Sequence, residues 1–443
     1  MCMLLRTKAL TAQRASGLAR AGAARKFFSK PAEPEPAKPP PEVITIAEAE
    51  TLLYNGIRSI GYNDADAIVM RDCMMWAQIR DNNQGMIKLT SGGLAKSGDG
   101  KPTIEIDSPT GARVNGNLAM SMPVMDFAIN LAIEKARASQ VGVVGTFNTS
   151  QSCGALGFYA EKIAKAGMIG VLMVTSPEFV APHGAKQAIL GTNPITCAVP
   201  TDQGTFLMDQ ATAGFPWFGL LEAKTAGIEI PEGVAFDSEG LPTRDPNKAL
   251  KGALRTFDRG YKSSNLALMV ELLAGPLVGA AHVNKLAAKN WGNLVIAIHP
   301  SLLGDAATFY KNAGEVLERV RCAERLPGVD KIVIAGEMEA AKAAARVAEG
   351  TLPIESNMLA ELRAMAANFT SQAGGGAAGG ATADRQVQLL EQLLSRIDQL
   401  EQQVTSNAQQ QAALTKQQQR LETVTAESLS ALRLANGHAN LKR

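Results

Sequence analysis

Few side chains of this 443-residue chain are suited to acid–base or metal chemistry. No histidine has a cysteine or carboxylate at the spacing of metal ligands, and the histidines lie far apart. They are His183, His282, His299 and His438. The sequence has no Walker loop, HExxH motif or nucleophile elbow, and no Rossmann glycine fingerprint follows an early strand. These absences exclude the commonest nucleotide-binding, zinc-hydrolase and serine-hydrolase signatures.

The overall composition is that of a soluble globular protein with a substantial core. Hydrophobic residues make up 46% and charged residues 19%, and the formal net charge is only +2. Nothing global therefore indicates nucleic acid or a membrane surface as partner. The five scattered cysteines contain no CxxC pair, which fits a reducing compartment. The longest apolar run, 266–281, is shorter than a bilayer requires and predicts a buried helix, with no transmembrane segment.

The first 30 residues differ in composition from the rest of the chain. They contain seven lysines and arginines, several hydroxyl side chains and no acid, as mitochondrial transit peptides do. The alternative is a disordered basic tail. A Pro-rich linker follows at 31–42, where proline density favours an extended spacer. We therefore expect a mitochondrial protein with residues 1–30 as its transit peptide.

The C-terminal part of the chain also has its own composition. A Gly/Ala linker at 371–384 precedes a Gln-rich helical tail at 385–443. Val387, Leu390, Leu394 and Ile397 have the 3-4-3 spacing of a coiled-coil seam. The tail is thus expected to be a coiled-coil-like helix that binds a partner. The alternative is a frayed, solvated helix, because a lone helix buries little.

Between these segments, strand-like and helix-like patterns alternate. Strands are predicted at 141–147, 169–175, 195–200 and 293–298, with helices such as 154–166 and 265–273 between them. Two early helices carry cap residues, Thr45 and Asn63. Alternation of this kind predicts an α/β domain with a buried sheet. This sheet and its helices must position any site.

Several stretches of this domain resemble the malate/L-lactate dehydrogenase family. They include residues 143–200, with Gly-Thr-Asn-Pro at 191–194, and the segments 208–212, 241–246 and 266–273. The resemblance spans about residues 43–367 and implies a domain at 43–370. It implies an α/β fold with a non-Rossmann mode of binding NAD or NADP, a homodimer, and interconversion of 2-hydroxy and 2-oxo acids. Thr192, Asn193 and Asp209 remain as the cofactor-binding positions that the resemblance implies.

The same resemblance shows where the chemistry has changed. Hydride loss from an alcohol requires removal of the hydroxyl proton, which histidine does best near neutral pH. Gln84 and Ser152 stand at the two histidine positions of the family, and an amide cannot take that proton. Lys88 replaces the arginine that would bind the substrate carboxylate, so the charge remains without the forked geometry. Lys262 matches the lysine of the family pattern.

Two other groups could replace the missing base. His183 lies in a loop near matched segments, although a loop histidine without catalytic role is the simpler reading. Asp81 is close in sequence, but an ordinary aspartate has a pKa near ~4 and suits neutral pH poorly.

Three functions are compatible with this pattern. The first is a mitochondrial pseudoenzyme with lost or strongly reduced dehydrogenase activity and a structural or scaffolding role in a larger assembly, reached through the N-terminal arm or the C-terminal helix. The alternative is an active NAD(P)-dependent oxidoreductase of malate or lactate type. The third is a module that binds NAD(P) without turnover.

Overall fold

The computed structural model describes residues 40–374. The expected transit peptide, most of the Pro-rich linker and the Gln-rich tail lie outside the described residues. Within them, no helix is long and apolar enough to span a bilayer.

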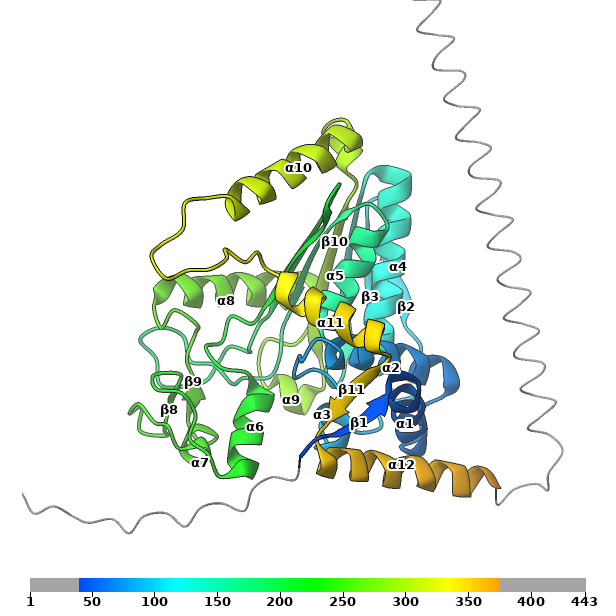
Figure 1. Ribbon diagram of the computed structural model, residues 1–443, viewed down its shortest axis with the longest axis vertical. Coiled ribbons are helices and arrows are strands. Elements are labelled where there is room, and N and C mark those ends of the chain that lie inside the picture. Colours follow the sequence, from blue (N-terminus) through cyan, green and yellow to red (C-terminus); the bar gives the residue numbers. More distant parts are fainter. Residues whose placement is uncertain (1–39, 375–443) are drawn as a thin grey trace, which may run out of the picture. The chain divides into compact units, whose positions relative to one another are not determined.

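A mixed seven-stranded sheet forms the centre of the domain (Figure 1). Its order is β2-β3-β4-β10-β5-β6-β7, and only β3 and β4 run parallel. The strands are β2 (Thr103–Asp107), β3 (Gly111–Asn115), β4 (Val141–Thr149), β5 (Ile169–Val174), β6 (Ile195–Thr201), β7 (Gly204–Gln210) and β10 (Trp291–Ile298). The four strands expected from the sequence are all present, and the α/β class is confirmed.

Alternate residues of the central strands face two different cores. Val295 and Leu172 pack in the larger core, which α4 (Ser121–Ser139) and α5 (Leu156–Lys165) cover. Leu294 and Met173 point to the other face, where α8 (Tyr261–Ala274) packs. Because the side-chain period of a strand is two, each strand contributes to both layers. The apolar run predicted to be a buried helix is α8 followed by the short helix η1 (Pro276–Val278).

The first and last elements of the domain pack against each other. Strand β1 (Glu42–Thr45) pairs antiparallel with β11 (Thr351–Ile354), and α1 (Ile46–Ser59) packs on α12 (Ser356–Gly374). Both predicted caps are present. The hydroxyl of Thr45 accepts from the N–H of Glu48 (3.1 Å), and Asn63 caps α2 (Asp64–Gln78). Helix α12 continues four residues beyond the expected domain boundary at 370.

Residues between 179 and 267, most of which follow β7 in the sequence, form a second and smaller hydrophobic core. Its hydrophobic residues include Val180, Leu190 and Leu220. The remaining short elements of the domain are α3 (Ile87–Thr90), α6 (Trp217–Ala226), β8 (Ala235–Phe236), α7 (Pro246–Ala249), β9 (Ala253–Leu254), α9 (Lys285–Ala288) and η2 (Pro300–Leu302).

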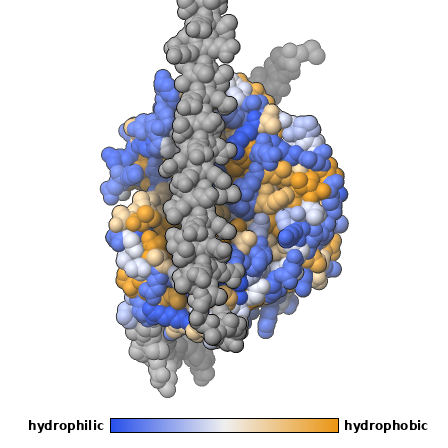
Figure 2. Space-filling model, turned by 90° about the vertical axis from the view of Figure 1, so that its right-hand side faces the viewer, coloured by the Kyte–Doolittle hydropathy of each residue, from blue (hydrophilic) through white to orange (hydrophobic). Residues whose placement is uncertain are grey.

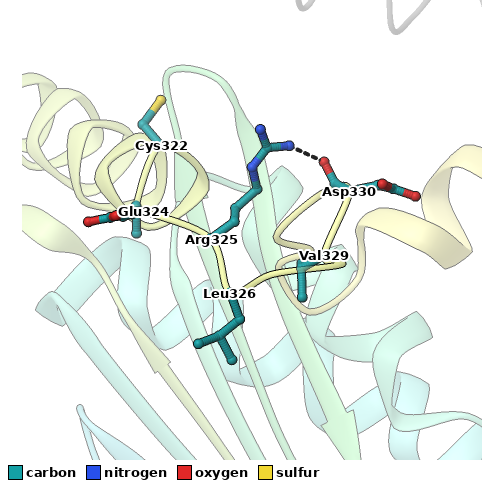
Figure 3. Close-up of a pocket in the computed structure, with 7 residues that line it drawn as sticks. Cys322, Glu324, Arg325, Leu326, Val329 and Asp330 are labelled. Carbon is teal, nitrogen blue, oxygen red and sulfur yellow. Dashed lines mark hydrogen bonds between the residues drawn. The ribbon is translucent and has the colours of Figure 1, made fainter.

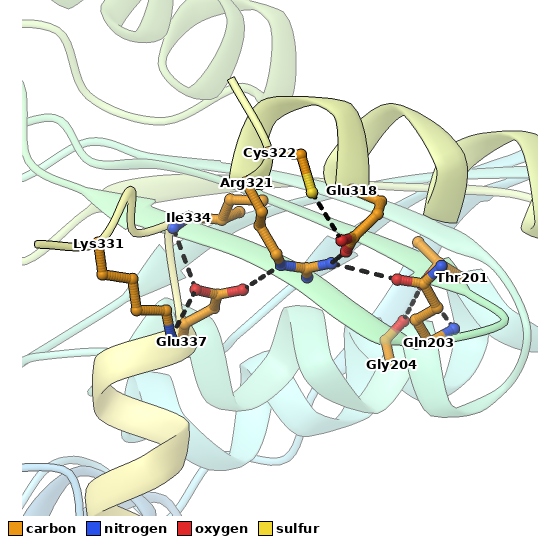
Figure 4. A network of polar contacts seen from close by, with 9 residues as sticks. All are labelled: Thr201, Gln203, Gly204, Glu318, Arg321, Cys322, Lys331, Ile334 and Glu337. Carbon is orange, nitrogen blue, oxygen red and sulfur yellow. Dashed lines mark hydrogen bonds and ion pairs between the residues drawn. The ribbon is translucent and has the colours of Figure 1, made fainter. Parts of the chain in front are cut away.

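The guanidinium of Arg321 connects three elements on the far side of the sheet (Figure 4). Arg321 is the last residue of α10 (Ala306–Arg321). Its guanidinium contacts Glu337 at 2.7 Å, at the start of α11 (Glu337–Glu349). It also reaches Glu318 at 3.2 Å and the side chain of Gln203 at 3.1 Å, in the β6–β7 turn. These contacts fix the two ends of the 322–336 segment.

That segment surrounds an open hollow of about 600 Å³ (Figure 3). One surface loop supplies its walls, and the Arg325 guanidinium donates to the Asp330 carbonyl oxygen. The Cys322 thiol donates to Glu318 (3.0 Å), and that carboxylate raises the pKa of Cys322, which keeps the thiol protonated. Cys322 is therefore not an activated nucleophile.

Candidate functional site

Lys88 lies in α3, a single turn that follows α2 after a tight connection. The carboxamide of Gln78 closes this connection by accepting the N–H of Met86 at 3.0 Å. Lys88 is fully buried. A buried lysine without an ion-pair partner is costly, and so its surroundings need an explanation.

Ser152 lies in the 150–155 loop that joins β4 to α5. Asn148 and Gln151 both have positive φ (52° and 66°), which is uncommon for residues with a side chain. The loop is fixed by hydrogen bonds: the Gln151 carbonyl oxygen accepts from the Trp291 indole N–H, at 2.8 Å. Strain of this kind costs free energy, and it clusters at functional sites. Helix α5 consequently begins at Leu156, two residues later than the sequence indicated.

The structure brings Lys88 and Ser152 together. The Lys88 ammonium donates to the hydroxyl oxygen of Ser152, which also accepts the N–H of Gly154 at 3.2 Å. The ring of Phe218, from α6, covers the ammonium with its centroid 4.2 Å from Nζ, a cation–π distance. Within residues 40–374, no carboxylate forms an ion pair with Lys88.

Burial controls the protonation of this cluster. It lowers the pKa of Lys88 to about 8, an effect that the thiols of Cys153 and Cys73 partly oppose. Burial also raises the pKa of Cys73 to about 11 and that of Cys153 to about 12. Both thiols are therefore neutral at physiological pH, and the lysine has no anion to stabilise its charge.

Gln84 is not part of this cluster. Its side-chain amide donates to the Asn83 carboxamide oxygen at 3.0 Å, and no described contact joins it to Lys88 or Ser152. Asp81 is already occupied, because its carboxylate pairs with Arg346 (2.5 Å) and Lys342 (3.3 Å). Burial raises the pKa of Asp81, but these bonds outweigh that effect and lower it overall. Asp81 is therefore a poor substitute base.

The other proposed proton-transfer and charged residues lie apart from the cluster. His183 is exposed, and its backbone N–H donates to the Ser264 hydroxyl at 3.0 Å. Lys262 is exposed in the first turn of α8, where its charge helps to lower the pKa of Asp258. Of the residues described, neither contacts Lys88 or Ser152. The histidine is thus in the position of an ordinary loop residue.

The three expected cofactor-binding residues form hydrogen bonds within the protein. Thr192 lies 3.2 Å from the Ser176 hydroxyl, and the amide of Asn193 donates to Glu271 at 2.8 Å. The carboxylate of Asp209 accepts the N–H of Gly157 and the Thr196 hydroxyl, both at 2.7 Å. Asp209 as a residue is exposed on edge strand β7, while its two oxygens turn inward. Burial of this carboxylate raises its pKa, and the two hydrogen bonds lower it in part.

A buried ion pair behind Asn193 was not foreseen from the sequence. Lys285 is fully buried and Glu271 is 8% exposed, and Nζ lies 2.6 Å from Oε1. The only signal was that Glu271 interrupts an otherwise apolar run. Asn193 Oδ1 is also buried, with no hydrogen-bond partner among the described residues. Within residues 40–374, no group of side chains is placed to hold a metal ion.

A sequence profile of the malate/L-lactate dehydrogenase family matches residues 44–363. The chain belongs to the malate/L-lactate dehydrogenase family. One relative is the malate/(S)-sulfolactate dehydrogenase of Methanothermus fervidus, 32% identical over 341 residues, which cover 73% of this chain and 97% of the relative. Another is the L-sulfolactate dehydrogenase of Methanothermobacter thermautotrophicus, 38% identical over 259 residues, 57% of this chain and 74% of the relative.

Solved structures agree with this assignment. The sulfolactate dehydrogenase of Methanocaldococcus jannaschii matches with a TM-score of 0.64 and 30% identity, covering 74% of this chain and 98% of that one. The malate dehydrogenase of Entamoeba histolytica has the same fold, with a TM-score of 0.69 at 23% identity and coverage of 74% and 98%. The expected dehydrogenase-type fold is therefore confirmed for the family domain.

The buried charge of Lys88 leads to a stability prediction. Lowering a lysine pKa from 10.5 to about 8 costs the fold about 3 kcal/mol at neutral pH. We therefore expect Lys88→Met to raise the free energy of unfolding by about 1–3 kcal/mol at pH 7, after loss of the Ser152 and Phe218 contacts. Denaturant melts at several pH values measure this.

The stability effect of Lys88 depends on pH because its pKa is lower in the folded protein than in the unfolded chain. Between pH 8 and about 10.5 the unfolded chain holds more protons at this lysine, so the unmodified protein gains stability as the pH rises. The advantage of the methionine variant should be complete below pH 8 and shrink toward pH 10.5. Lys311→Met, at an exposed lysine, is the control. A clear loss of stability in Lys88→Met at pH 7 would contradict the unpaired charge.

Proposed function

We propose that this protein is a malate/L-lactate dehydrogenase homologue with strongly reduced 2-hydroxyacid turnover and a structural role in an assembly. One observation carries the proposal: Ser152 and Lys88, at positions of the family's proton-transfer and carboxylate-binding residues, are hydrogen-bonded to each other. Gln84, at the other histidine position, turns to Asn83. No histidine contacts this cluster within residues 40–374.

The size of the expected loss follows from the missing groups. A general base contributes about 10²–10⁴ in rate. An ammonium cannot offer a carboxylate the two parallel hydrogen bonds of an arginine, and Lys88 is also buried beneath Phe218. We therefore expect turnover at least ~10²-fold below that of a family enzyme.

NAD or NADP is the cofactor that this fold implies, and when bound it would accept or donate the hydride. Asn193 Oδ1, the buried acceptor without a partner, fits an amide donor such as a nicotinamide carboxamide. Thr192 and Asp209 instead bond within the protein. Cofactor affinity can thus persist where turnover does not, as in a module that binds NAD(P) without chemistry.

Exposed apolar surface supports an assembly role and a homodimer. From Leu266 to its end, helix α8 is apolar except for Glu271, yet Leu268 and Leu272 are 45% and 55% exposed. Such a helix is normally covered. Edge strand β2 is exposed along its length, including Ile104 and Ile106. On the face shown in Figure 2, hydrophobic residues also form patches among hydrophilic ones. We propose that a second copy or a larger mitochondrial assembly covers some of these surfaces.

An initial-rate assay tests the proposal. The full chain is incubated with L-malate, L-lactate or (S)-sulfolactate, or with the corresponding 2-oxo acids, and with each nicotinamide cofactor in the appropriate redox state. A family malate/sulfolactate dehydrogenase is assayed alongside. We expect kcat/KM at least ~10²-fold lower for this chain. Comparable rates would refute reduced turnover.

An active oxidoreductase remains the second candidate, for one specific reason. The pKa of Lys88, about 8, suits a proton acceptor near neutral pH. In that case Lys88→Met would abolish robust turnover, whereas Gln84→Ala would leave it unchanged.

The proposed mitochondrial location rests on the acid-free, basic composition of residues 1–30. Fusing these residues to a fluorescent reporter should send it to mitochondria. Replacing their arginines and lysines with glutamine is the control, which should leave the reporter in the cytosol. Diffuse cytosolic signal from the unmodified fusion would refute the targeting proposal.

A further inference from the structure

Ser152 lies on a strained turn between a strand and a helix. Strand β4 ends at Thr149 and α5 begins at Leu156, and Gln151, the residue before the serine, has φ 66°. Nucleophilic serines of α/β-hydrolases also lie on strained connections between a strand and a helix. The sequence around the serine, Ser150-Gln151-Ser152-Cys153-Gly154, lacks the first glycine of the usual motif, so the pattern alone did not reveal it.

The serine and the lysine differ in access to solvent. Ser152 is half-buried, whereas Lys88 is fully buried behind it. Part of Ser152 is therefore open to solvent, whereas the Lys88 amine is shielded from water. This is the arrangement that a nucleophile and its base require: hydrogen-bonding contact between them, and an open side only at the nucleophile.

We propose that Ser152 and Lys88 form a serine–lysine dyad that accepts acyl groups from small esters. This activity is separate from hydride transfer and does not depend on the proposed function. Serine–lysine pairs replace the serine–histidine pair on unrelated folds, so the chemistry requires geometry and not a particular fold.

Hydrolysis of an ester at this dyad requires only the ester and water. Neutral Lys88 Nζ takes the proton of the Ser152 hydroxyl as Oγ forms a bond to the ester carbonyl carbon. The C–O bond to the alcohol then breaks, and the alcohol leaves with the proton from Nζ. Water attacks the acyl-serine in the same way, which releases the acid and restores both side chains.

The surroundings of the lysine suit this role. The titratable groups that act on its charge are Cys73, from α2, and Cys153, from the loop, and both are neutral at physiological pH. The carboxylate of Asp209, on β7, raises the pKa of both thiols. No described carboxylate pairs with Lys88 to keep it protonated. Burial lowers the pKa of Lys88 to about 8, so a usable fraction is the free amine near neutral pH.

Covalent labelling of the full-length protein tests the dyad. We expect an alkyl fluorophosphonate to add one equivalent to the intact mass and peptide mapping to place it on Ser152. p-Nitrophenyl acetate should likewise give a burst of p-nitrophenol and an acetyl group on the same serine. The labelling rate should rise with pH through about 8, as Lys88 loses its proton.

Three variants make the test specific. Ser152→Ala should abolish the label. Lys88→Met should slow labelling at least ~10²-fold, the low end for loss of a general base. Ser150→Ala is the matched control, because its hydroxyl lies in the same loop but bonds to Ser97 at 2.9 Å; it should label normally.

The proposal is overturned if the label maps to another residue, or if Lys88→Met labels as fast as the unmodified protein. It is also overturned if the unmodified protein is not labelled at all. Circular dichroism checks that each variant folds. If Lys88→Met does not fold, the map and the pH profile of the unmodified protein decide. Dehydrogenase assays do not enter this test, so its failure leaves the proposed function intact.

Discussion

Glu271→Ala is expected to lower the free energy of unfolding by about 3–5 kcal/mol, because it leaves Lys285 as a buried charge without a partner. The lost carboxylate also accepts the Asn193 amide at 2.8 Å, so the loop that carries Thr192 and Asn193 loses a support. Urea or guanidinium unfolding, followed by far-UV circular dichroism, measures the change.

Two comparisons separate the buried charge from other effects. Glu315→Ala removes an exposed partner of Lys311 and should cost under ~1 kcal/mol. The double change Glu271→Met, Lys285→Met removes both charges and should be far less harmful than the single change, because no unpaired charge remains. If Glu271→Ala costs no more than Glu315→Ala, the pair does not contribute as described.

The layout of the fold could be predicted in large part from local sequence. The four strands around 141–147, 169–175, 195–200 and 293–298 have compact apolar runs, and all four occur in the central sheet. The caps at Thr45 and Asn63 depend only on neighbouring residues, so they were predictable as well. Strand order depends on contacts between distant segments, and periodicity carries no information about it.

The site was predictable by position but not by contact. Motif order indicated that Gln84, Lys88 and Ser152 replace reactive residues. The bond between Lys88 and Ser152 joins segments 64 residues apart and depends on the strained 150–155 loop, which shortens α5. Likewise, Gln84 is near Lys88 in the sequence, but the tight turn after α2 directs its amide to Asn83. Phe218, which covers the lysine, is in a helix without a recognisable motif.

The proposed function attributes the loss of turnover to the residues at three positions, Gln84, Lys88 and Ser152. A single Gln84→His change should restore little, because Lys88 cannot act as a forked clamp and Ser152 is still no base. Groups that act as a unit are not additive in their effects. The informative variant is therefore the triple change Gln84→His, Ser152→His, Lys88→Arg.

The measurement that tests the central claim most directly is kcat/KM for reduction of a 2-oxo acid, in the unmodified chain, the triple variant and Gln84→Ala. We expect very low turnover in the unmodified chain and in Gln84→Ala, and a gain of roughly 10²-fold in the triple variant, the low end of what a general base contributes. Robust turnover in the unmodified chain that Gln84→Ala leaves unchanged would contradict it, because another group would then carry out the proton transfer.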